Sequence, residues 1–198
     1  MRPVADDPRS VLPTFMRDLP LARAALEYAR DLHADQRRDS DRAPFILHPL
    51  EVAAMLSNTG HAEPVVTAGV LHDTVEDAGS DIDEIRTRFG DDVASLVDAL
   101  TEDGSIDAYE ERKAGLRRQI AEAGRDASSV YAADKVAKVR ELRAQAAAQP
   151  QILGEDAIRR KVEHYHRSLE TLESIDPEHP LVRQLRFELE ALHALPPG

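Results

Sequence analysis

Apolar residues recur along this chain at the three- and four-residue spacing of α-helices, and no segment shows the strict alternation of a half-buried strand. Proline and glycine residues separate these helical stretches. The sequence therefore predicts an all-α fold, a single bundle of about eight to ten helices. We expect an N-terminal arm at residues 1–18 and one domain at 19–195, with a core at 19–148 and C-terminal helices at 156–195.

The helices are expected at residues 21–33, 48–59, 64–73, 80–89, 91–100, 107–123, 128–148, 156–175 and 180–195. The last of them carries an apolar stripe at helical spacing, which suits either the core or the contact surface of a homodimer. The stripe consists of Val182, Leu185, Leu189 and Leu192.

Charge and cysteine content limit the partners of the chain. It has 25 Lys and Arg against 37 Asp and Glu, a formal net charge of −12, which disfavours DNA and RNA but leaves room for a local basic site for a small anion. It has no cysteine, so any bound metal must be held by histidines and carboxylates. No run of about 18 apolar residues occurs, which predicts no membrane span and a cytoplasmic protein.

The helix expected at 64–73 is almost purely apolar and ends in His72-Asp73-Thr74-Val75-Glu76-Asp77. Burying His72 and Asp73 at the end of such a helix is costly unless something compensates, and a divalent cation would do so. If the helix continues, His72 lies one turn from Glu76, and Asp73 one turn from Asp77. The alternative is a solvated, acidic helix end.

Two further residues extend this candidate metal site. His48 comes just before Pro49 at the start of a helix, and Asp134 lies in a stretch otherwise rich in alanine and valine. The alternative for Asp134 is an ion pair with Lys135 or Lys138. Two imidazoles and two carboxylates form a mixed nitrogen and oxygen site, which suits a Mn²⁺-like ion better than a closed structural zinc.

The order His48, then His72-Asp73, then Asp134 resembles the HD-domain metal phosphohydrolases. The surrounding sequence narrows the resemblance to the hydrolase domain of the Rel/SpoT alarmone enzymes, and the length makes the chain most similar to the small, stand-alone alarmone hydrolases. The blocks that carry the likeness are residues 29–38, 44–53, 71–77, 89–93 and 133–135, and the likeness covers about residues 20–195.

This resemblance implies hydrolysis of guanosine tetra- and pentaphosphate, the signalling nucleotides of the stringent response, to GDP or GTP and pyrophosphate by metal-activated water. One Mn²⁺ would be held at the positions that match the family's ligands, which are His48, His72, Asp73 and Asp134. Glu76 and Asp77 match the acidic pair that orients and activates the attacking water.

Substrate contacts are also implied by the resemblance. Arg37 and Arg38 match the family's basic loop, and Lys161 and Tyr165 match an Arg and a Tyr that contact the nucleotide. Their alternatives are a solvent-facing loop and an ordinary helix surface. Lys138, which we also expect to contact substrate, stands where relatives have Asn.

Two further departures bear on the substrate. Asp39 follows the arginine pair where a lysine is common, and Phe45 replaces the usual Tyr. Together with Lys138, these changes favour one alternative, a phosphohydrolase for another nucleotide, such as an NADPH 2′-phosphatase. A further alternative is a regulator that binds a nucleotide without turnover, and the complete set of metal-ligand and acidic residues argues against it. We expect five other histidines to have surface or supporting roles: His61, His164, His166, His179 and His193.

Overall fold

A computed structural model describes residues 12–195 of the chain; residues 1–11 and 196–198 lie outside the described part. The predicted all-α class is confirmed, because these residues form helices and no strand, with one isolated bridge between Arg37 and Pro44. The helices are α1 (Pro20–Leu32), α2 (Leu47–Asn58), α3 (Glu63–Leu71), α4 (Thr74–Ala78), α5 (Ile82–Phe89), α6 (Asp91–Leu100), α7 (Tyr109–Ala123), α8 (Arg125–Ala148), α9 (Asp156–Ile175) and α10 (Pro180–His193).

Residues 1–11 of the predicted arm thus lie outside the described residues. The rest of that segment contains a short 3-10 turn, Thr14–Met16 (η2), and the Met16 side chain is fully buried in the core. A second 3-10 segment, Pro150–Gly154 (η3), connects α8 to α9. Of the helices in residues 12–195, none combines the length and apolarity needed to cross a membrane.

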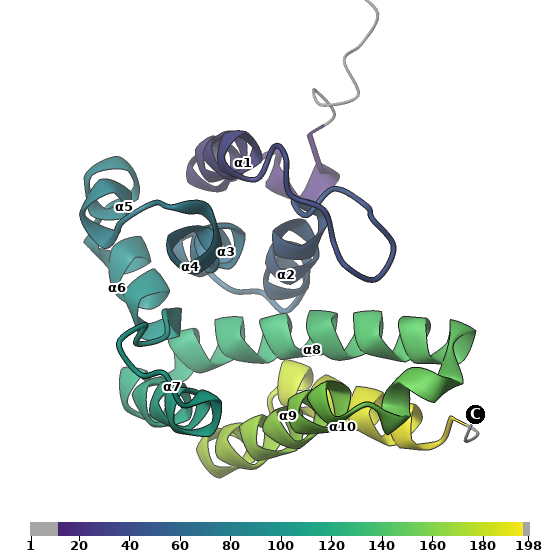
Figure 1. The fold of residues 1–198 in the computed structure, drawn as a ribbon. Helices are drawn as coiled ribbons and strands as arrows, with labels where there is room; N and C mark the ends of the chain where they lie inside the picture. The colour runs from purple at the N-terminus through teal and green to yellow at the C-terminus, as the bar shows by residue number, and fades with distance from the viewer. Residues whose placement is uncertain (1–11, 196–198) are drawn as a thin grey trace, which may run out of the picture.

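The long helix α8 runs through the middle of the molecule, with α1 to α4 on one side and α7, α9 and α10 on the other (Figure 1). Every residue from Ala127 to Ala137 is buried, so this stretch of α8 is packed on all of its faces. Asp134 is the one acidic residue between Ala127 and Ala137, so α8 delivers a single buried carboxylate to the centre of the fold.

Gly69 allows α2 and α3 to approach closely. A Cβ atom at this position would lie 2.6 Å from Leu56 Cδ1 and 3.4 Å from Val52 Cγ1, so any larger residue would push the helices apart. The close approach matters for the site, because α2 carries His48 and α3 ends at His72.

The helix α3 does not continue through the acidic segment. It ends at Leu71, and Asp73 has φ −110° and ψ 0°, outside the helical region, before α4 begins at Thr74. The Thr74 hydroxyl donates to the Leu71 carbonyl at 2.7 Å, which satisfies one carbonyl at the break. The turn places His72 and Asp73 at a junction between two helices.

The apolar stripe on α10 belongs to the core. Its four side chains are at most 3% exposed, and α10 packs along α8. These residues are covered within the chain, so the stripe fills the core and is not a dimer contact surface.

Candidate metal centre and substrate cleft

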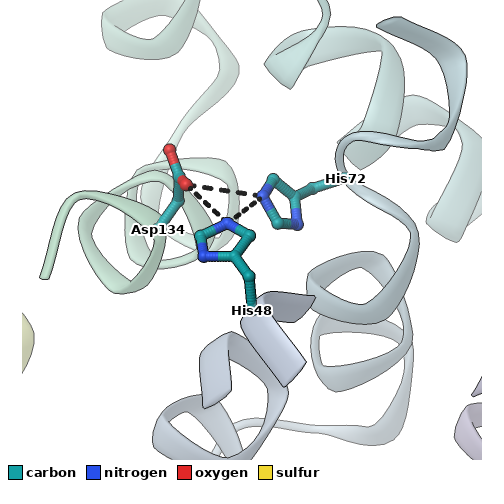
Figure 2. Close-up of side chains that lie close together, drawn as sticks. All are labelled: His48, His72 and Asp134. Atoms are coloured by element: carbon teal, nitrogen blue, oxygen red, sulfur yellow. Dashed lines mark hydrogen bonds and ion pairs between the residues drawn. The ribbon is translucent and has the colours of Figure 1, made fainter. Parts of the chain in front are cut away.

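Three predicted metal ligands converge from three separate helical segments. His48 comes from the first turn of α2, His72 from the end of α3, and Asp134 from the middle of α8 (Figure 2). His48 Nε2 lies 3.3 Å from His72 Nε2 and 3.1 Å from Asp134 Oδ1, and His72 Nε2 lies 3.5 Å from the same oxygen. All three side chains are buried, which makes this group a candidate metal centre.

The hydrogen bond of His72 supports a metal at this point. Its Nδ1 lies 2.9 Å from the carbonyl oxygen of Gly69, so Nδ1 carries the proton and donates it. In the neutral ring the Nε2 lone pair then points into the cluster. Histidines that bind metals in proteins are held in this way by a carbonyl or a carboxylate on the other ring nitrogen.

Asp73 lies beside the cluster and has unsatisfied oxygens. Both carboxylate oxygens are buried without a hydrogen-bond partner in residues 12–195, and Oδ2 lies 3.8 Å from His72 Nε2. Burial raises the pKa of Asp73, but the charges of nearby histidines and a contact with His33 outweigh it and lower the pKa to about 2. Such a buried, ionised carboxylate, whose oxygens lack a hydrogen-bond partner in residues 12–195, fits a cation, as expected for the fourth ligand.

Asp134 forms both of the ion pairs that were considered as alternatives for it. Lys135 Nζ lies 2.6 Å from Oδ2, and Lys138 Nζ lies 3.0 Å from Oδ1, the oxygen that also faces the two histidines. Burial disfavours the charge of Asp134, but the two lysines and the histidines hold its pKa well below the usual value. Asp134 therefore pairs with two lysines and also faces the two histidines of the candidate metal centre.

Glu76 and Asp77 lie on α4, and both side chains are exposed. Glu76 Oε1 accepts a hydrogen bond from the backbone N–H of Glu102, which fixes one carboxylate oxygen. Reduced hydration, together with the negative charge of Glu102, raises the pKa of Glu76 despite that hydrogen bond. The backbone carbonyl of Asp77 accepts a hydrogen bond from Gln36 Nε2 at 2.6 Å.

A cleft of about 370 Å³ adjoins the metal centre and contains all five predicted substrate contacts. Its lining carries six cationic side chains and two acidic ones, although the whole chain has a net charge of −12. The cationic residues are Arg37, Arg38, Lys113, Lys135, Lys138 and Lys161. The local basic site that the sequence left open thus exists in the structure.

Lys135 and Lys138 connect the cleft to the metal centre, since both line the cleft and both pair with Asp134. Tyr165 is buried in the wall, and burial raises its pKa to about 12. Lys161, one turn earlier on α9, is exposed. A larger cleft of about 700 Å³ at η3, α9 and α10 lies away from the three ligands and contains none of the predicted site residues.

The sequence reasoning missed His33. This residue is 2% exposed, and its Nε2 lies 3.4 Å from Asp73 Oδ1, while Nδ1 lies 2.7 Å from Gln36 Oε1. Burial opposes its charge, but Asp73 raises the pKa of His33. The signal was present, because residue 33 continues the buried face of α1 one turn after Ala29.

His164 is buried as well, at 3% exposure, and is not a surface residue. It lines the cleft and precedes Tyr165. Its position, four residues before the buried Ser168 and eight before Leu172, marks the inner face of α9.

Comparison with known families places the chain in a class. Residues 25–158 match the HD domain, which is more than half of the chain, so the chain belongs to the HD-domain family. The three ligands reach the centre from α2, α3 and α8, all within the matched region.

Particular relatives are more specific. The chain is 35% identical over 129 residues to MESH1 of Xenopus tropicalis, a guanosine-3′,5′-bis(diphosphate) 3′-pyrophosphohydrolase. The matched residues make up 64% of this chain and 72% of that protein. It is 38% identical over 96 residues to an enzyme of Aquifex aeolicus with the same activity in its name; the match is 48% of this chain but 14% of the Aquifex enzyme's length.

The fold is also similar to a solved structure, described as a metazoan ortholog of SpoT that hydrolyses ppGpp and plays a role in starvation responses. The TM-score is 0.74 at 25% sequence identity, and the match covers 94% of this chain and all of that one.

Proposed function

We propose that this chain is a metal-dependent hydrolase that removes the 3′-diphosphate from guanosine-3′,5′-bis(diphosphate), leaving GDP and pyrophosphate, and GTP from the pentaphosphate. The observation that carries the proposal is the connection between the three buried ligands and a basic cleft through Lys135 and Lys138. One animal relative and one bacterial relative, MESH1 of Xenopus tropicalis and the Aquifex aeolicus enzyme, are named for this activity, which supports the same substrate here.

The donor set supports a divalent cation held by His48, His72 and Asp134, with Asp73 as the fourth ligand. Imidazole nitrogen and carboxylate oxygen without sulfur suit a Mn²⁺-like ion better than a closed structural zinc. When bound, such an ion supplies Lewis-acid chemistry: it polarises phosphoryl oxygens and lowers the pKa of water.

The cleft residues bind and orient the polyphosphate. Arg37 and Arg38 come from the loop after α1, and Lys161 comes from α9, so cations from separate elements line the same cleft. A guanidinium can bind two phosphate oxygens at once, whereas each lysine acts as a point charge. This arrangement would hold the 3′-diphosphate against the metal centre in a fixed orientation.

Glu76 is the base in this proposal. A water oxygen forms a bond to the phosphorus attached to the ribose 3′-oxygen, and the bond from phosphorus to that oxygen breaks. The water gives a proton to Glu76 Oε2, since Oε1 is occupied by the Glu102 N–H. The departing 3′-oxygen takes up a proton from solvent and Glu76 releases its proton to solvent, so that one water is consumed in each turnover. The raised pKa of Glu76 makes its carboxylate a stronger proton acceptor.

A second substrate is favoured by one observation. Lys138, where relatives have Asn, places a positive charge beside Asp134 in the cleft. An additional point charge could favour a terminal phosphate such as the 2′-phosphate of NADPH. The non-catalytic alternative is disfavoured because a pure binding module has no chemical use for Glu76 and Asp77.

The test is an end-point assay on the purified chain, stripped with a chelator and then supplied with Mn²⁺ or buffer. We expect guanosine tetraphosphate to yield GDP and pyrophosphate in equal amounts, only with the metal. Phosphate release from NADPH alone would assign the second substrate. Binding of the nucleotide without any product would contradict the hydrolase. A cytoplasmic location, a homodimer and a role in the stringent response stay predictions.

A further inference from the structure

A buried histidine in the cleft wall has one ring nitrogen without a partner. His164 is 3% exposed and lines the cleft, and its Nε2 has no hydrogen-bond partner in the described part of the chain. Buried polar atoms in folded proteins are nearly always paired. An unpaired one in the wall of a binding cleft therefore points to a ligand atom.

Arg117 fixes the tautomer of this ring. Its Nη1 lies 2.9 Å from His164 Nδ1, and a guanidinium can only donate hydrogen bonds, so Nδ1 is the acceptor. A neutral imidazole that accepts at Nδ1 carries its proton on Nε2. The unpartnered atom of His164 is thus a donor, and its missing partner is an acceptor.

The charge state is fixed by the same surroundings. Burial, followed by the positive charges of Lys135, Lys113 and Arg117, lowers the pKa of His164 to about 2, against a smaller opposing effect of Asp134. The rings of Tyr109 and Tyr165 lie beside it, with centroids at 6.5 and 5.7 Å. The ring stays neutral, and its surroundings favour an acceptor that carries negative charge.

We propose that His164 is a substrate-binding residue whose Nε2–H donates a hydrogen bond to a phosphoryl oxygen of the bound nucleotide. A phosphoryl oxygen suits the site better than a base carbonyl, because the three cations around the ring stabilise an anionic acceptor. The inference rests on the proposed function only in taking a phosphate-bearing nucleotide as the ligand. It adds a neutral hydrogen-bond donor to a cleft that also carries six cationic side chains.

Nuclear magnetic resonance of the histidine side chains tests the contact directly. Long-range ¹H–¹⁵N spectra of the wild-type chain in Mg²⁺ at neutral pH should show His164 as the Nε2–H tautomer. Addition of inorganic pyrophosphate should shift that Nε2 resonance. The proposal is overturned by an Nδ1–H tautomer, by no shift with pyrophosphate, or by a shift with guanosine and none with pyrophosphate.

Binding measurements give the size of the effect. By calorimetry, His164→Leu should weaken pyrophosphate binding about tenfold, the usual loss for one hydrogen bond to a charged group. His164→Gln should stay within about threefold of wild type, because its amide can accept from Arg117 and still donate. Equal binding by wild type and a folded His164→Leu chain would overturn the proposal.

His166→Leu is the matched control. His166 lies on the same helix but lines the larger cleft at η3 and α10, so pyrophosphate binding should be unchanged. If the His164 variants fail to fold, the spectra of the wild-type chain still test the proposal through the tautomer of His164 and its shift with pyrophosphate. Pyrophosphate binding needs no turnover, so a chain that fails to hydrolyse guanosine tetraphosphate but shows the Nε2 shift would refute the proposed function alone.

Discussion

The metal centre and the cleft share the helix α8, but they are built in different ways. The three ligands of the centre are all at most 6% exposed and are held by tightly packed helices. The cleft takes its residues from a loop, from α7 and from α9, and several of them, such as Arg37 and Lys161, are exposed. Packing therefore fixes the reactive centre, whereas the substrate contacts depend on side chains that a few substitutions can change.

The largest effect is expected from the centre itself. His72→Ala removes one of three converging ligands and the link to Gly69, so we expect turnover to fall by roughly a thousandfold or more. Product formation from guanosine tetraphosphate at saturating Mn²⁺ measures this loss. Turnover near the wild-type level would show that the cluster is only an ion-pair network.

The next effect concerns the proton acceptor. Glu76→Gln should leave metal binding intact and lower kcat by about a hundredfold to a thousandfold, because the amide cannot take a proton. Glu122→Gln changes an exposed acid on α7 and should leave kcat unchanged. A Glu76→Gln chain with normal kcat would transfer the role to another group, with Asp77 as the first candidate.

A packing change should reach the centre through the backbone. Gly69→Ala places a methyl group against Leu56 and separates α2 from α3, so the free energy of unfolding should fall by about 1–3 kcal/mol, with weaker metal binding. Gly115→Ala is the matched control, since its Cβ would meet atoms only at 3.9 Å. Denaturant unfolding of both variants measures the difference, and equal stabilities would contradict the packing argument.

The smallest effect is expected where the two regions meet. Lys138→Asn removes a cation that lies 3.0 Å from the ligand oxygen of Asp134, so Mn²⁺ should bind about two- to fivefold more tightly. The gain is modest because the Lys138 side chain is 41% exposed and screened by solvent. Lys161→Asn, which changes a cleft lysine on α9, should leave the affinity for Mn²⁺ unchanged. Weaker Mn²⁺ binding by Lys138→Asn would show that the lysine supports the site.

The sequence predicted the helices well, because α6 and α9 have the expected bounds and their signals are local. The three side chains of the candidate metal centre could also be predicted, since buried polar residues are rare in apolar helices. Three features could not be predicted from the sequence: the helix break after Leu71, the contact of His33 with Asp73, and the pairing of Arg117 with His164. Each depends on how segments 40 or more residues apart meet, or on a turn that local spacing does not predict.

The central claim is that His48, His72 and Asp134 form a metal site. Electron paramagnetic resonance of free Mn²⁺ during titration of the chelator-treated chain measures it without any substrate. We predict one bound ion per wild-type chain, and its loss in His48→Ala with the fold retained by circular dichroism. No bound Mn²⁺, or equal binding by His48→Ala, would contradict the account.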